Sequence, residues 1–425
     1  MLEVLIPALI ILIGLSLLKV PIYISVFCSA IYLQLFVNHM SLSSLFTGFF
    51  EAMTKNSLLA VPFFMVAGSI IAASSLGTRL INVCIELLKS VRGGLPIACV
   101  IANAIFGAIS GSGPAATATF GKVAFKPLSD HHGESMALGI ITSSACLSTI
   151  IPPSITMIIY GVATETSITQ LFMAGVLPGV FIVIVIGAYL VIRCKRRPGE
   201  ERERFSASGF AKAFWKGIPV LLLPVIVLGS VYTGFCTPTE SGALAAAYSF
   251  VVAVFGTRDI KPRQLLSIFK DSGRTTAQVF LLIAASTVFA QAITVAQVPA
   301  AVTAAFSGMS QVQFLLMLNI LLLIVGCFFD TSAAILILAP ILLPTALGLN
   351  IHPLHLGMVF VVNLAIGLFT PPFGLNIFVA QSVLKRPMGA ISKACVPYII
   401  LYIICVLVIS YVPALTTTLP TLLLG

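Results

Sequence analysis

The chain has 425 residues, of which 59% are hydrophobic and only 8% are charged, and its mean hydropathy is +1.12. Soluble domains carry roughly 25% charged residues, so this composition excludes a water-soluble enzyme, a secreted domain, a coiled coil and a disordered chain. It predicts an all-α polytopic membrane protein. The 23 basic residues outnumber the 13 acidic ones, but they cluster between apolar runs as in the positive-inside rule, so no nucleic-acid partner is expected.

Apolar runs divide the chain into spans of about 20 residues, the length that crosses a bilayer. The first span, near 2–18, follows no basic n-region, which favours a span over a removable signal peptide. A tail at 414–425 follows the last span. In chain order, the first five spans lie near 2–18, 21–37, 57–77, 135–160 and 172–192, and the second five lie near 218–235, 241–256, 275–297, 355–382 and 395–413.

The two sets of spans form an internal repeat. The proline pair Pro152–Pro153 recurs 219 residues later as Pro371–Pro372. Several anchors at one offset indicate duplication, with a first repeat over 1–192, a charged cytoplasmic linker over 193–217 and a second repeat over 218–413. The same offset relates Gly107 to Gly326, Pro178 to Pro397, Ser144 to Asn363 and Ser148 to Gly367.

The charges of the loops indicate that the two repeats are inverted. Segment 79–92 carries three basic residues, whereas its counterpart 298–311 carries no charge; the contrast reverses between 164–174 and 383–393. If basic loops face the cytoplasm, the repeats lie in opposite orientations and each crosses the membrane an odd number of times. Both termini are then expected to face outside.

Two further apolar stretches, 94–125 and 312–347, are each flanked by loops assigned to one side of the membrane. Turn-forming residues interrupt both, at Ser110–Pro114 in the first and at Asp330–Ser332 in the second. In the first stretch, glycine and proline end one half-helix and start another. We therefore predict two re-entrant helical hairpins, one in each inverted repeat.

The spans that follow the hairpins are interrupted at matching places, 148–154 and 367–376. A proline pair frees backbone carbonyls, which are costly in hydrocarbon unless they line a cavity or bind a ligand. Half-helix N-termini offer N–H groups to an anion, and freed carbonyls and hydroxyls suit a hard cation. Such interruptions in two repeats indicate the central site of a secondary transporter; a simple proline kink is the alternative.

Asp330 is the only charged residue between Arg274 and Lys385. A carboxylate at membrane depth is costly and marks a functional position, so Asp330 is a candidate cation ligand or else a solvated hairpin tip. A membrane enzyme using Asp330 as an acid or base is disfavoured, because it would need a second polar catalytic group and the sequence offers only hydroxyls and amides. No H-E-x-x-H or G-x-S-x-G motif indicates a protease or an esterase, and we expect no enzymatic activity. The basic stretch 258–274 predicts an interfacial helix, with a docking surface as the second interpretation.

Three motifs together resemble the large membrane subunit of TRAP (tripartite ATP-independent periplasmic) transporters, within the ion-transporter superfamily, and this resemblance implies an inverted-repeat elevator-type transporter. They are Gly111–Ala115 (GSGPA), Thr237–Glu240 (TPTE) and Thr370–Asn376 (TPPFGLN), and the resemblance covers essentially the whole chain. It implies Na⁺-coupled uptake of an organic anion across the bacterial inner membrane. It also implies two partners, a small four-span membrane subunit, expected here as a separate chain, and a periplasmic substrate-binding protein.

The resemblance also implies roles for individual residues and for the substrate. Sialic acid and C4-dicarboxylates are the leading candidates, and the chain resembles the sialic-acid branch most. A stand-alone dicarboxylate or citrate carrier of the same superfamily is the alternative that needs no partners. By motif position, Ser110, Gly111, Ser112 and Thr149 would lie near one Na⁺, Asp330, Thr331, Gly367 and Thr370 near a second Na⁺, and Ser154 and Asn376 near the substrate.

Overall fold

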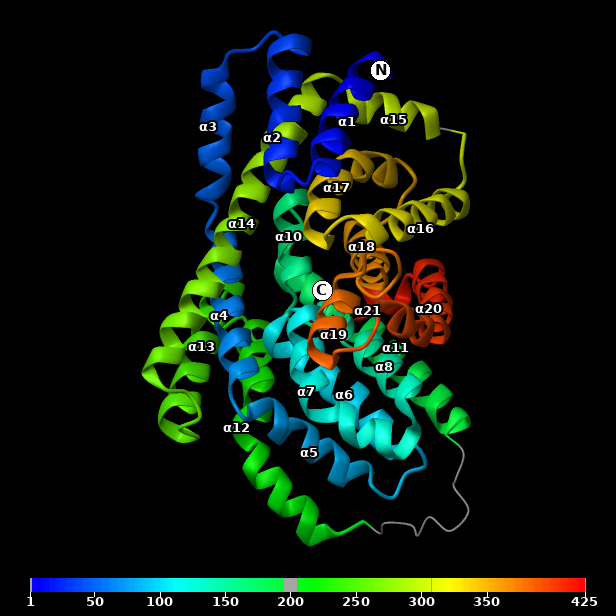
Figure 1. Cartoon of the computed structure of the whole chain (residues 1–425). Coiled ribbons are helices and arrows are strands. Elements are labelled where there is room, and N and C mark those ends of the chain that lie inside the picture. The colour runs from blue at the N-terminus through cyan, green and yellow to red at the C-terminus, as the bar shows by residue number, and fades with distance from the viewer. Residues whose placement is uncertain (1, 195–204, 307, 425) are drawn as a thin grey trace.

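The computed structural model describes residues 2–194, 205–306 and 308–424, and within these ranges every regular element is a helix (Figure 1). Eight of the described helices are long and apolar enough to cross a membrane, and a bent pair over residues 134–164 would make a ninth. The prediction of an all-α polytopic membrane protein is confirmed.

The elements of the first half run in chain order from α1 to α11. They are α1 (Leu2–Leu17), α2 (Ile22–Tyr32) with a π-helical turn (Leu33–Val37), α3 (Leu42–Met53), a 3₁₀ turn (Asn56–Leu59), α4 (Ala60–Ala73), α5 (Leu76–Leu88), α6 (Gly94–Ser110), α7 (Gly113–His132), α8 (Glu134–Ser144), α9 (Leu147–Ile150), α10 (Ile155–Thr164) and α11 (Ile168–Arg193).

The second half contains α12 to α21. They are α12 (Ala207–Tyr232), α13 (Pro238–Val251) with a π-helical turn (Val252–Gly256), α14 (Pro262–Val295), α15 (Val298–Phe306), α16 (Gln311–Phe328), α17 (Thr331–Gly348), α18 (Pro353–Gly367), α19 (Leu375–Leu384), α20 (Met388–Tyr411) and α21 (Ala414–Leu424).

The offset of 219 residues found in the sequence also relates structural details. The π-helical turns occupy 33–37 and 252–256, and a left-handed residue follows each, His39 (φ 52°) and Arg258 (φ 56°). Two helices joined by a two-residue break, α6–α7 and α16–α17, contact each other at the positions predicted for the hairpins. Their re-entrance into the bilayer stays a prediction, since α16 and α17 are each long enough to cross.

Several segments differ from the sequence prediction. The stretch 258–274 is not a separate interfacial helix, because α14 runs without a break from 262 to 295. Its basic residues are on the exposed face, while Ile268 and Ser272, one turn apart, are buried and keep the helix packed. Segments treated as loops form α5 and α15, α12 begins earlier than its predicted span, and the tail forms α21.

The helices pack in two groups. α3, α4, α13 and α14 lie along one side of the molecule, with α11, α16 and α20 along the other (Figure 1). α13 packs on α4. Both α2 and α3 pack on α14, and α12 packs on α5. α5 and α15 lead from the first group into the two helix pairs α6–α7 and α16–α17.

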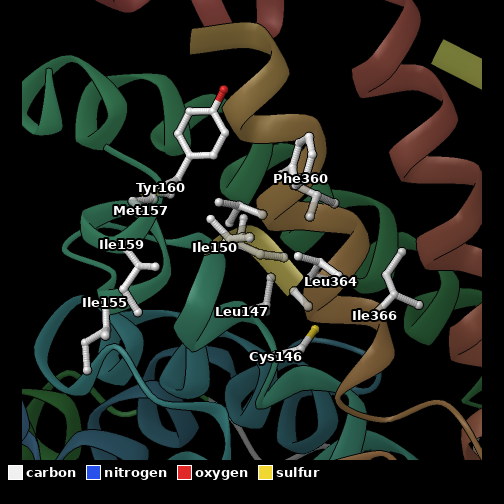
Figure 2. Packing of buried hydrophobic residues seen from close by; sticks show 14 of the residues in the cluster. Cys146, Leu147, Ile150, Ile155, Met157, Ile159, Tyr160, Phe360, Leu364 and Ile366 are labelled. Atoms are coloured by element: carbon white, nitrogen blue, oxygen red, sulfur yellow. The ribbon is translucent and has the colours of Figure 1, made fainter. Parts of the chain in front are cut away.

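The two interrupted spans pack against each other at the centre of the second group. In Figure 2 Ile150 of α9 lies beside Leu364 of α18, and Tyr160 of α10 and Phe360 of α18 lie at the same end of this contact. Tyr160 is fully buried, its ring lies 5.9 Å from that of Phe360, and its hydroxyl donates to the Pro353 carbonyl at 3.1 Å. This apolar contact brings the breaks of both spans to one region.

Candidate functional site

The first break is a sharp turn between α6 and α7. Gly111 ends α6 with φ 57°, a left-handed conformation that glycine adopts without strain. Ser112 then caps α7, because its hydroxyl accepts from the Ala115 N–H at 3.4 Å. A Cβ on Gly111 would lie 3.1 Å from the Ile155 nitrogen. The turn is therefore seated directly against the break of the following span.

That span is interrupted between α9 and α10. Pro152–Pro153 is joined by a cis peptide bond, and the chain leaves the helix over 151–154 before α10 begins. The Ser154 hydroxyl donates to the Thr149 carbonyl across the break. Ser154 is fully buried, and Thr149 is nearly so.

The second break lies between α16 and α17. Asp330 is exposed, and its carboxylate accepts from the Ser332 N–H at 2.9 Å, so it caps α17. Anionic groups are favourable at a helix N-terminus. Asp330 thus sits at the tip of the helix pair, next in sequence to Thr331, as predicted.

Close backbone contacts join each helix pair to its interrupted span. A Cβ on Gly107 would lie 2.5 Å from the Ser148 Cα, and a Cβ on Gly367 would lie 2.3 Å from the Gly326 oxygen. These pairs are the sequence anchors related by 219 residues. The contacts explain why small residues recur at these positions, since only they let the helices approach so closely.

The second interrupted span breaks between α18 and α19. The Asn376 N–H donates to the Leu368 carbonyl at 2.8 Å across the break, and the Thr370 hydroxyl donates to Ile366. Asn376 is fully buried; its amide donates to the Thr142 carbonyl at 3.3 Å, while its Oδ1 has no partner. A Cβ on Gly113 would lie 3.0 Å from that oxygen. The amide therefore reaches from the second span to the start of α7.

A cavity of about 380 Å³ opens where the two tips approach each other. It brings together six of the ten predicted residues; Ser154, Gly367, Thr370 and Asn376 do not line it. Sequence reasoning missed its α14 wall, with Asp271, Ser272 and Thr275, and Ser69 of α4. The six predicted residues that line the cavity are Ser110, Gly111, Ser112, Thr149, Asp330 and Thr331.

The chemistry of this cavity suits cations better than a bare anion. Among the described residues that line it, the charged side chains are the carboxylates of Asp271 and Asp330, and hydroxyls surround them. Ser272 and Ser69 are linked by a 3.0 Å hydrogen bond, which joins α14 to α4 at the wall. Oxygen donors of this kind are the ligands that hard cations prefer.

Comparison with known proteins identifies the family. The model of the DctM family, the DctM component of the tripartite ATP-independent periplasmic transporter, matches residues 9–415. The chain belongs to this family. The resemblance to TRAP large subunits is thereby confirmed, and the chain is a large permease protein of a TRAP transporter.

Curated relatives support the DctM assignment over nearly the whole chain. A C4-dicarboxylate TRAP transporter large permease protein of Pseudomonas aeruginosa is 39% identical over 387 residues, covering 89% of this chain and 90% of that protein. Its counterpart in Vibrio cholerae is 34% identical and covers 98% and 97%. An isethionate permease, DctMQ, of Oleidesulfovibrio alaskensis is 37% identical; the match covers 86% of this chain and 58% of that longer protein.

A solved structure has the same fold. The YdaH transporter of Alcanivorax borkumensis, described as having an unusual topology, superposes with a TM-score of 0.58 at 14% identity, covering 89% of both chains. At this identity the likeness concerns the fold alone. It supports the arrangement of helices in this DctM-family permease.

Proposed function

We propose that the protein is the large permease of a Na⁺-coupled tripartite importer of a small organic anion. The cavity between the two tips supports this most, because it places the carboxylate of Asp330 and several hydroxyls at interrupted helices and the carboxylate of Asp271 on the adjoining wall of α14. Interrupted helices at matching positions of two repeats form the substrate and ion sites of secondary transporters. In this proposal Ser110, Ser112 and Thr149 contribute oxygens to one Na⁺, and Asp330 and Thr331 contribute to another.

The two carboxylates give a physical reason for coupling. An anionic substrate that approached Asp271 and Asp330 alone would meet like charges, an unfavourable arrangement in a medium less polar than water. Bound Na⁺ neutralises these carboxylates and draws the two tips together. The substrate then binds well only to the ion-loaded permease, so the ion gradient supplies the work.

For the substrate, we propose a C4-dicarboxylate, with sialic acid as the second candidate. Three relatives are named for C4-dicarboxylates, whereas others are named for isethionate and ectoine. The buried amide of Asn376 and the hydroxyl of Ser154 lie at the two spans' breaks, and the unpartnered Asn376 Oδ1 supports a role in ligand recognition. Neither side chain lines the cavity here, so this role requires the tips to separate.

We propose an elevator mechanism for the translocation step. α5 and α15 connect the group formed by α3, α4, α13 and α14 to the helix pairs that carry the tips. Such connecting helices allow one group to move against the other without unfolding a span. The small four-span subunit would enlarge the static group, and the periplasmic binding protein would deliver the substrate at the bacterial inner membrane.

Uptake by proteoliposomes tests the proposal. The permease, its small subunit and the binding protein are reconstituted together, and uptake of labelled succinate and sialic acid is measured with an inward Na⁺ or K⁺ gradient. We expect uptake of one of these anions only with Na⁺ and only with the binding protein present. Equal uptake with K⁺ would refute the coupling, and full uptake by the permease alone would favour a stand-alone carrier.

A further inference from the structure

A second, smaller cavity lies between α5 and α12, away from the cavity at the two tips. Its volume is about 320 Å³. α5 and α12 pack against each other at the end of the molecule where α12 begins (Figure 1). The polar side chains that line it are Arg79, Asn82 and Glu86 from α5 and Lys212 and Lys216 from α12.

Two glycines of α12 set the spacing of the helices around this cavity. A Cβ on Gly217 would lie 2.5 Å from the Val83 side chain, so the helices touch there. A Cβ on Gly209 would lie 2.8 Å from the Glu86 carboxylate. Between these two contacts Lys212 and Lys216, one helical turn apart, face the cavity from the same side of α12.

The cavity carries an excess of positive charge. Its three basic side chains face one carboxylate, Glu86, whose Oε1 pairs with Lys89 at 3.5 Å and whose Oε2 is buried without a hydrogen-bond partner. Arg79 is held in place, since its guanidinium donates to the Ser75 hydroxyl at 3.1 Å and to the Lys216 carbonyl at 3.4 Å. Within the described ranges Lys212 and Lys216 have no acidic partner. The two ammonium groups are thus available to an anion, and the guanidinium of Arg79, which also interacts with the Asp259 carboxylate through the Ser75 hydroxyl, lies beside them.

The surroundings on α12 are those of a membrane interface. Phe210 packs against Phe205 and Phe214, with ring centroids 5.9 and 5.8 Å apart. Trp215, next to Lys216, is 77% exposed. Aromatic side chains of this kind concentrate at the headgroup level of membranes, and basic pockets between helices on the cytoplasmic side bind anionic headgroups. Further along α12, exposed Leu222 and Val225 offer an apolar surface for acyl chains.

We propose that this cavity binds the phosphate of an anionic phospholipid. The phosphate bridges Lys212 and Lys216 of α12 and Arg79 of α5, while the acyl chains lie along the outer face of α12. The lipid then fastens α5 to α12. Because α5 leads from α4 into the first helix pair, anionic lipid would stabilise the position of this connection. The site does not depend on the ion or the substrate of the permease.

The chain contains a single tryptophan, Trp215, which adjoins the proposed site and reports on it. The full-length chain is reconstituted in phosphatidylcholine containing a small fraction of brominated phosphatidylglycerol or, separately, of brominated phosphatidylcholine, and quenching of Trp215 is measured. We expect roughly thirtyfold stronger apparent binding of the brominated phosphatidylglycerol, the size of effect that two lysines produce at an anionic surface. The preference should weaken as the salt concentration rises.

Two matched variants test the assignment. K212Q/K216Q should lose the preference for phosphatidylglycerol, whereas K122Q/K126Q, which removes another exposed lysine pair one turn apart on α7, should keep it. Equal quenching by both lipids in the wild type would overturn the proposal, and so would an unchanged preference in K212Q/K216Q. Relief of quenching by inorganic phosphate, but not by chloride at the same ionic strength, would assign the cavity to a free phosphate and overturn the lipid assignment.

Discussion

Replacing Asp330 by asparagine separates the two roles that the structure gives this residue. Its carboxylate caps α17 through the Ser332 N–H at 2.9 Å, and it lines the cavity at the two tips. Asparagine caps a helix about as well as aspartate, whereas alanine costs about 1 kcal/mol. D330N should therefore keep the stability of the protein nearly unchanged, and D330A should lower it by that amount.

The effect on Na⁺ follows from the charge that asparagine lacks. Unit charges 4 Å apart attract by about 4 kcal/mol at an effective dielectric constant of 20 and by about 1 kcal/mol in water. Asp330 is exposed, so a value below the upper limit applies, about 1.4 to 2.8 kcal/mol. The Na⁺ concentration for half-maximal uptake should rise roughly tenfold to a hundredfold in D330N, since each 1.4 kcal/mol is a factor of ten.

The assay is uptake by proteoliposomes as a function of Na⁺ concentration, with thermal unfolding measured on the same preparations. D130N removes an exposed carboxylate from the far end of α7 and should leave the Na⁺ dependence unchanged. A normal Na⁺ dependence in D330N, with the protein folded, would refute the assignment of Asp330 to the ion site.

Two further predictions concern packing and pH. G367A should lower the free energy of unfolding by about 2 to 3 kcal/mol, because its Cβ would lie 2.3 Å from the Gly326 oxygen. In the control G187A nothing lies within 4 Å of the new Cβ, so this variant should keep the stability of the wild type in a thermal unfolding assay. Equal stability of the two variants would contradict the close contact at Gly367. Partial burial opposes ionisation of Asp259, but hydrogen bonds from the Ser75 hydroxyl and backbone outweigh it and lower its pKa. Its contribution, less than about 1 kcal/mol at a site still largely screened by solvent, is present above the ordinary carboxyl range and is lost as the pH falls through the lowered pKa. D259N should reduce the loss of stability on acidification, and an unchanged pH dependence of the melting temperature would count against this.

The positions of the breaks could be predicted from the sequence because glycine and proline interrupt a helix when they occur together inside a span. Gly111 adopts the left-handed turn that its place between two half-helices requires, and Asp330 starts α17. The sequence identifies Gly107 and Gly326 as repeat anchors by their offset alone. The structure explains why both are glycine, because each lies where two helices contact closely.

The orientation of side chains around the breaks could not be predicted. Ser154 lies at its break as expected, but its hydroxyl turns to the Thr149 carbonyl, and Thr370 turns to Ile366. Neither contact follows from spacing along the chain.

The wall of the cavity on α14 was missed for a different reason. Basic residues over 258–274 favoured an interfacial helix, although Ile268 and Ser272, four residues apart, already mark one buried face of a longer helix. Likewise, the charges of 79–92 indicate a loop, whereas α5 occupies most of this segment. For both α5 and α14, a helical periodicity of buried residues among the charged ones is the feature of the sequence that could have predicted the helix.

Coupled flux is the most direct test of the account. Influx of ²²Na⁺ into proteoliposomes is measured together with influx of the labelled anion, in the presence of the binding protein and the small subunit. We predict that the anion stimulates ²²Na⁺ influx in the wild type and in D130N, and that this stimulation is lost in D330N at the same Na⁺ concentration. Anion influx without any accompanying ²²Na⁺ would contradict the central claim that the two tips form an ion site that drives transport.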